Sequence, residues 1–292
     1  MNAAKRHVVA RKRIALFQKH LRADPYGLVE RLSNELIGKL GRTQPPFQTE
    51  NFEYASLVGA TVVRTSIASD GLMSMFNGQI TIEVNRHRTP ERQSFTVCHE
   101  VAHIQIRKET GLLAAQKEIE MSPGVPFQVT SSRLEEKMAE AMAANLLLPR
   151  GDFVCRAGEL QPTIENAISL ANTYKASLGA TLRRAVFLRV WNCGIMWCKP
   201  EKMSHGRWAV HIQELRSNSK HGPTWPSHGY VWWGAETVRK SFVSPDPIKD
   251  TVEIDGQKWS LQALREWYFG PEGRENRVMA ILRPLTAAKR ND

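Results

Sequence analysis

Two histidines and a glutamate lie within five residues of one another, in the segment His99-Glu100-Val-Ala-His103. Residues four apart on an α-helix lie on the same face, so the imidazoles of His99 and His103 can reach one metal ion. Glu100 is offset from His99 by about 100° around the helix axis, which places its carboxylate beside a water on the metal. The spacing therefore predicts a zinc site with His99 and His103 as ligands and Glu100 as the general base of a hydrolysis.

A third zinc ligand is expected from another part of the chain, because a catalytic zinc ion has three protein ligands and one open position. The helix predicted for residues 133–148 is the expected donor, and Glu135, Glu136 and Glu140 are its candidates. Ser132 and Glu135 have the spacing of a capping box, which gives Glu135 a structural role. Glu136 is therefore the preferred ligand, with Glu140 as the alternative.

The segment that carries the histidines is predicted to be a buried helix over residues 89–108. Thr89, Pro90 and Glu91 suit its first turn, because they supply a capping hydroxyl, a preset φ angle and a negative charge near the positive end of the dipole. Its second half is apolar on nearly all sides. Buried histidines carry a desolvation cost that a divalent cation offsets. A polar cluster without metal is the alternative.

Further elements are expected on both sides of this helix. Residues 61–67 and 79–84 are rich in β-branched side chains and, with the turn Asn77-Gly78, predict a small antiparallel sheet. The strand 79–84 is expected to offer a sheet edge to an extended substrate. Residues 111–131 contain Gly and Pro and predict an irregular connection, and a pair of helices is predicted between Thr163 and Val190.

The fold class is predicted to be α+β, with three parts. Residues 1–46 form a basic helical segment and a linker, which ends in Gly and paired Pro. Residues 47–190 form a zincin-like helical catalytic domain with the small antiparallel sheet. Residues 191–292 form a β-rich C-terminal domain with one short helix near residues 260–268. All eight tryptophans lie in this last part, which indicates a folded accessory domain of unknown role.

The net charge of +11 and the isoelectric point near 9.7 favour anionic partners, such as nucleic acid or an acidic protein. Seven basic residues precede Asp24, the first acidic residue, and they predict a nucleic-acid arm, a presequence or a solvated helix face. No apolar run of the length needed to cross a bilayer is present, so a cytoplasmic protein without membrane contact is expected. The four cysteines are too few for a disulfide framework.

Two stretches resemble the ImmA/IrrE family of zinc metallo-endopeptidases, which is found in bacteria and their mobile elements. Residues 92–104, RQSFTVCHEVAHI, are similar to the family pattern RQRFTLAHELGHI, with Cys98 in place of Ala and Ala102 in place of Gly. Residues 136–149, EKMAEAMAANLLLP, are similar to ExxANxFAxxLLMP, with Glu140 in place of Asn and Met142 in place of Phe.

The predicted helix pair also resembles the family, because Leu170 to Ser177 is similar to its LAxxFxVS segment. The resemblance covers residues 47–190. It implies that Glu136 is the third zinc ligand, and Glu140 remains the alternative. It also implies a regulatory role, because family members cut or control a DNA-binding repressor of the Cro/cI type.

We therefore predict a zinc-dependent endopeptidase that cleaves a protein substrate, a Cro/cI-type repressor or another regulator, through a metal-activated water. Tyr174, His205 and His211 are the candidates for stabilising the oxyanion. The alternative is a non-catalytic, zinc-containing regulator or sensor that binds DNA or a repressor. Glu100 distinguishes the two, because a structural zinc site needs no base. A phage-encoded peptidase whose C-terminal domain recognises a narrow target is a third hypothesis.

Overall fold

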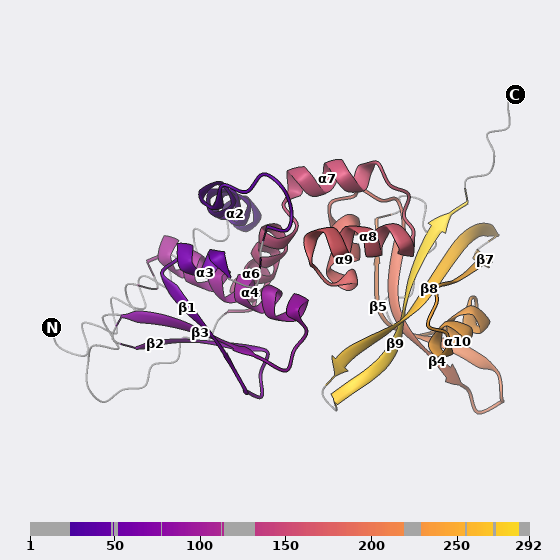
Figure 1. Cartoon of the computed structure of the whole chain (residues 1–292). Coiled ribbons are helices and arrows are strands. Elements are labelled where there is room, and N and C mark those ends of the chain that lie inside the picture. Colours follow the sequence, from indigo (N-terminus) through magenta and orange to yellow (C-terminus); the bar gives the residue numbers. More distant parts are fainter. Residues whose placement is uncertain are drawn as a thin grey trace, which may run out of the picture. The chain divides into compact units, whose positions relative to one another are not determined.

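The computed structural model describes residues 24–47, 49, 52–76, 78–111, 113, 132–218, 229–254, 256–270 and 273–285. Within these ranges the chain forms eight helices and nine strands, in a three-stranded and a six-stranded sheet (Figure 1). This mixture confirms the predicted α+β class and the β-rich C-terminal part. The basic segment before Asp24 and nearly all of the connection 111–131 lie outside the described residues. None of the described helices is long and apolar enough to cross a bilayer.

The chain divides into two compact units. Unit 1 contains residues 1–150 and 173–177, and unit 2 contains residues 151–172 and 178–292. The helices that follow Arg150 thus belong mainly to the unit with the six-stranded sheet, whereas the predicted limits of 47–190 and 191–292 group them with the metal-binding motif. Those limits remain a prediction of how the functional domains divide.

In unit 1, helices cover one face of a three-stranded sheet (Figure 1). The strand order is β1-β3-β2, with β1 parallel and β2 antiparallel to the central strand β3. The elements of this unit are α2 (Pro25–Leu40), α3 (Glu53–Leu57), β1 (Ala60–Thr65), β2 (Gly71–Phe76), β3 (Gln79–Asn85), α4 (Pro90–Glu109) and α6 (Arg133–Leu147).

The prediction of this sheet was partly wrong. The strand β2 was missed, because its sequence GLMSMF contains no β-branched residue. Since β2 forms the tight hairpin with β3, β1 joins the other side of β3 in the parallel direction. The predicted use of strand 79–84 as a substrate-binding edge is also wrong, because β3 is central and the edges of the described sheet are β1 and β2.

The helix α4 lies between the sheet and α6, and it contacts β2, β3 and α6. It begins as predicted, because the Thr89 hydroxyl accepts a hydrogen bond from the backbone N–H of Arg92. Its side chains Val97, Val101 and Ile104 are fully buried. A helix enclosed in this way has little room for polar side chains without partners.

The strand β2 approaches α4 closely at Gly71. A Cβ atom at this position would lie 2.3 Å from Cγ2 of Thr96 and 3.2 Å from the carbonyl oxygen of Glu83. Only glycine fits this approach without displacing a neighbour. Thr96 precedes His99 by almost one helical turn, so this contact sets how closely the sheet approaches the part of α4 that carries the histidines.

Unit 2 is built on an antiparallel six-stranded sheet with the order β6-β5-β4-β9-β8-β7. The helix α10 packs on one face, over a core that includes Val210, Val238, Trp259 and Leu261. The elements are α7 (Arg150–Gly158), α8 (Ile164–Tyr174), α9 (Leu178–Phe187), β4 (Gly194–Lys202), β5 (Trp208–Ser217), β6 (Gly229–Val231), α10 (Ala235–Val243), β7 (Ile248–Ile254), β8 (Gln257–Gly270) and β9 (Gly273–Pro284).

The short helix predicted near residues 260–268 is wrong, because these residues belong to β8. The segment LQALRE within it favours a helix by local propensity, but β8 pairs with β7 over residues 257–263 and with β9 over residues 259–270. Among the described residues after Trp191, the helix is α10, which was not predicted from the sequence. The predicted pair of helices is confirmed as α8 and α9, and Trp191, Trp197 and Trp259 are fully buried, as expected of core residues.

A half-buried charged cluster joins α9 to the sheet of unit 2. The Arg183 guanidinium donates two hydrogen bonds to Glu214, at 3.1 and 2.7 Å, and lies 4.1 Å from the ring centroid of Trp197. Arg216 donates to the same carboxylate at 2.6 Å. Arg184 is buried. Both arginines of α9 are therefore engaged within the fold of unit 2.

We predict that Gly71→Ala destabilises unit 1 by roughly 1–3 kcal/mol, because the new methyl group collides with Thr96. The substitution Thr96→Ser removes the colliding carbon, so Gly71→Ala costs less in the protein that already carries Thr96→Ser. Urea denaturation of the four proteins of this double-mutant cycle measures the difference. Gly38→Ala is the control, because a Cβ there meets no atom within 4 Å and helix α2 gains from alanine. An equal cost of Gly71→Ala in both backgrounds would contradict the proposed collision.

A second prediction concerns acid stability. Burial alone raises the pKa of Glu214, but the hydrogen bonds and charges of Arg183 and Arg216 outweigh it and lower the pKa to about 2. Glu214 therefore stabilises the fold above its unfolded pKa, near 4.5, and this contribution is lost as the pH falls toward 2. Glu214→Gln is expected to cost roughly 1–2 kcal/mol at pH 7, because the side chain is 29% exposed, and almost nothing near pH 2.

The measurement is the free energy of unfolding of both proteins between pH 2 and 7. The exposed Glu253 on β7 offers a control, and Glu253→Gln is expected to leave the pH profile unchanged. A constant difference between the Glu214→Gln and unaltered proteins over this pH range would refute the assignment.

Candidate metal centre

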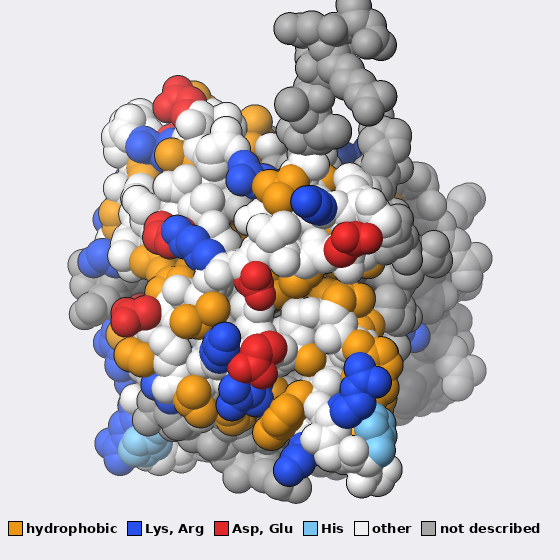
Figure 2. Space-filling model, turned by 90° about the vertical axis from the view of Figure 1, so that its right-hand side faces the viewer, with side chains coloured by type: hydrophobic (Ala, Val, Ile, Leu, Met, Phe, Trp, Pro, Cys, Tyr) orange, Lys and Arg blue, Asp and Glu red, His pale blue; other side chains and the backbone are white. Residues whose placement is uncertain are grey.

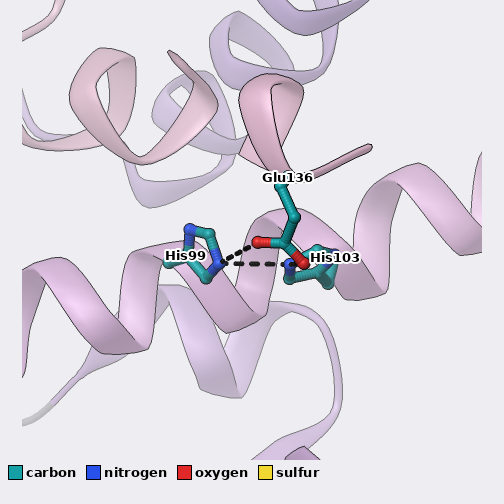
Figure 3. A group of neighbouring side chains, drawn as sticks. All are labelled: His99, His103 and Glu136. Atoms are coloured by element: carbon teal, nitrogen blue, oxygen red, sulfur yellow. Dashed lines mark hydrogen bonds and ion pairs between the residues drawn. The ribbon is translucent and has the colours of Figure 1, made fainter. Parts of the chain in front are cut away.

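The structure brings His99, His103 and Glu136 together at the contact between α4 and α6 (Figure 3). The two histidines lie on one face of α4, and their Nε2 atoms are 3.1 Å apart. Glu136, in the first turn of α6, places Oε2 at 3.3 Å from His99 Nε2 and Oε1 at 3.5 Å from His103 Nε2. Four potential ligand atoms from two helices thus converge on one point.

The three side chains differ in their exposure to solvent, so the site has a buried side and an exposed side. His103 is 6% exposed and His99 is 17% exposed, whereas Glu136 is 41% exposed. The imidazoles therefore form the buried side of the group, and the Glu136 carboxylate borders the solvent.

Glu135 has a role that the sequence analysis missed. Ser132 caps α6 as predicted, because its hydroxyl accepts from the Glu135 backbone N–H at 3.1 Å. The Glu135 carboxylate, however, accepts hydrogen bonds from Nδ1 of His103 at 2.8 Å and from Nε of Arg107 at 2.7 Å. The capping-box serine gave a correct helix start, but the spacing alone does not show where a glutamate side chain points.

Burial shifts the pKa of His99 and that of Glu135 in opposite directions. Burial and the neighbouring His103 lower the pKa of His99 to about 4, so this imidazole is neutral at pH 7. Burial raises the pKa of Glu135, but the hydrogen bonds from His103 and Arg107 and the charge of Arg107 outweigh it and bring the pKa below its usual value. A neutral imidazole has a lone pair available for a metal ion.

Glu100 follows His99 on α4 and is half-buried. Burial raises the pKa of this carboxyl, while the nearby His103 and Arg107 limit the rise. A carboxylate whose affinity for protons is raised is a stronger base than an exposed one. Glu100 therefore has the position and the environment expected of a general base beside the group.

The residues fit a zinc ion. Two imidazole nitrogens and one carboxylate are a ligand set of catalytic zinc, and the potential ligand atoms all lie within 4.8 Å of one another. The Nδ1 atom of His99 is buried and has no hydrogen-bond partner among the described residues. Two adjacent imidazoles in an enclosed helix are costly unless a cation draws their lone pairs together.

The other residues singled out from the sequence are not members of this group. Glu140, one turn further along α6, is exposed and is not part of the group. Tyr174 is fully buried and stacks on Phe47, so it does not suit the oxyanion role. His205 and His211 belong to unit 2, where their rings lie 5.5 Å from Trp232 and 4.9 Å from Tyr230, respectively.

Comparisons with known proteins agree with this geometry. Residues 58–186 match the family model Peptidase_M78, described as the IrrE N-terminal-like domain. A solved structure titled Mycobacterium tuberculosis transcriptional regulator is similar in fold, with a TM-score of 0.61 and 14% sequence identity over 88% of this chain and 76% of that chain. Among curated proteins, none matches the sequence significantly. The motifs and the family match agree with each other, and both support the ImmA/IrrE family for residues 58–186.

Proposed function

We propose that the chain is a zinc-dependent endopeptidase in which His99, His103 and Glu136 hold the metal and Glu100 is the general base. The convergence of the two Nε2 atoms and the Glu136 carboxylate carries this proposal. Bound zinc would polarise the scissile carbonyl and acidify water. Glu100 would accept the proton of the attacking water and transfer it to the leaving amine. The buried imidazoles would exclude bulk water on the side away from Glu136.

An extended protein segment is the substrate that best suits unit 1. Among the described strands, β2 is an edge that pairs only with β3, and it approaches α4 at Thr96. Leu72 and Phe76 of β2 are 51% and 77% exposed, so they can contact alternate side chains of a peptide that adds to this edge. Unfolded or mobile segments are the parts of proteins that can adopt this conformation.

The proposed substrate is a regulatory protein, a Cro/cI-type repressor or another regulator. This choice follows the family and the cytoplasmic location expected from the sequence. The transcriptional regulator found by fold comparison shares only 14% identity, so it supports the fold and not the target.

A non-catalytic regulator that binds DNA or a repressor is the second candidate, and the net charge of +11 favours it. On the face shown in Figure 2, however, basic and acidic side chains lie interspersed among hydrophobic ones, so the described surface there presents no field of one sign. The raised pKa of Glu100 also favours the enzyme, because a structural site needs no base.

The proposed function predicts the metal content of the protein. Protein purified without chelators is expected to contain about one zinc per chain by elemental analysis. Glu136→Ala and His99→Ala are expected to lose the metal, because each removes one of three ligands. Glu140→Ala is the matched variant on the same helix and is expected to retain it. Loss of zinc in Glu140→Ala alone would exchange the roles of the two glutamates.

The proposed function also predicts that Glu100→Gln abolishes cleavage and leaves the zinc content unchanged. A general base contributes at least about 100-fold to the rate, so cleavage is expected to fall by that factor or more. The zinc-loaded protein is incubated with a library of unfolded peptides, and new N-termini are detected by mass spectrometry. Glu109→Gln, which changes a carboxylate on the same helix that pairs with Arg31, is the control. Equal cleavage by Glu100→Gln and the unaltered protein would remove Glu100 from the mechanism.

A further inference from the structure

We propose that Glu135, held in place by Arg107, is a positioning residue that fixes which ring nitrogen of His103 faces the metal site. The inference rests on the proposed function, because it assigns a purpose to contacts around a metal ligand. It goes beyond that function in naming two residues that lie outside the ligand set and the base.

One oxygen atom connects the three side chains. Oε1 of Glu135 accepts from His103 Nδ1 at 2.8 Å and from Arg107 Nε at 2.7 Å. The side chains of Glu135, His103 and Arg107 are 3%, 6% and 7% exposed, so water does not compete for these bonds. Hydrogen bonds to charged groups in such surroundings are short and strongly orienting.

The arrangement selects one tautomer of His103. A guanidinium has only donors, and a carboxylate facing it has only acceptors. The nitrogen of His103 that contacts Glu135 must then carry the hydrogen, which leaves the lone pair on Nε2. This Nε2 atom faces His99 Nε2 at 3.1 Å and Glu136 Oε1 at 3.5 Å. The consecutive residues Glu135 and Glu136 of α6 thus face opposite nitrogens of the His103 ring, Nδ1 and Nε2 respectively.

The two histidines are held in different ways. His103 is fixed at Nδ1 by Glu135, whereas Nδ1 of His99 has no hydrogen-bond partner among the described residues. Partners of this kind fix the tautomer and orientation of a ligand and increase metal affinity. We therefore expect the affinity of the site to depend on the contact at His103. Arg107 has a distinct task, because without it the Glu135 carboxylate would be a buried charge with only an imidazole as partner.

The first test requires no metal. In the metal-free protein with ¹⁵N-labelled histidines, long-range ¹⁵N–¹H correlation spectra are expected to show His103 protonated at Nδ1. In the double variant Glu135→Ala with Arg107→Met, the proton is expected to move to Nε2, because neither the acceptor nor an orphaned buried charge remains. The double variant also avoids the unfolding that Glu135→Ala alone invites. An unchanged Nδ1–H tautomer in this variant, or Nε2–H in the unaltered protein, would overturn the inference.

The second test measures zinc affinity by competition with a chromophoric chelator. The double variant is expected to bind zinc about 10–100-fold more weakly, with one zinc still bound at saturation. Glu135→Gln, which keeps an acceptor oxygen of the same shape, is expected to recover part of this loss. Glu109→Gln removes a carboxylate that Arg31 bonds on the same helix, and it is expected to leave the affinity unchanged.

The outcomes separate this inference from the proposed function. Equal zinc affinity in the double variant and the unaltered protein overturns the positioning role and leaves the metal site intact. Absence of zinc binding by the unaltered protein overturns the proposed function. The tautomer measurement then still decides whether Glu135 orients His103.

Discussion

The packing of α6 against α4 is the contact on which the candidate site depends. His99 and His103 come from one helix and Glu136 from the other, and the hydrogen-bonded pair His103–Glu135 joins segments 32 residues apart. Without α6, the enclosed face of α4 would carry two imidazoles and Arg107 with no acidic partner. Desolvation of these groups is costly, so the first turn of α6 with its two glutamates is required for the fold as well as for the site. Stability and ligand geometry thus rest on the same few contacts.

The sheet constrains α4 from the other side. Gly71 allows β2 to approach Thr96 more closely than any side chain would permit, and the core of α4 is filled by Val97, Val101 and Ile104. A helix held on both sides cannot shift without opening a cavity or creating a collision. This rigidity suits a metal site, because ligands must keep their positions to within a fraction of an ångström.

The rules of single helices were enough to predict the site residues. The pairing of strands and side chains that are far apart in the sequence could not be predicted in this way. The four-residue spacing of His99 and His103, the cap at Ser132 and the helix start at Thr89 follow rules of single helices, and the structure has them as expected. β1 pairs with β3 in the parallel direction because β2, a strand with weak β propensity, forms the hairpin with β3. Residues of β8 have a sequence that favours a helix, but they form a strand because they pair with β7 and β9. The Glu135 carboxylate bonds to His103 and Arg107 of α4 and does not complete the capping box of its own helix. No rule based on local sequence specifies these partners.

The environment of Glu100 bears on whether the group is catalytic or structural. Glu135 bonds His103 and Arg107, and Glu136 faces both imidazoles, so these two carboxylates have direct partners at the helix contact. Glu100 is half-buried beside them, and burial raises its pKa. A fold that needed only a structural metal would be more stable with an uncharged residue at this position, because burial of a carboxylate is unfavourable. The presence of Glu100 next to His99 and near His103 therefore favours the proposed role of this carboxylate as a general base.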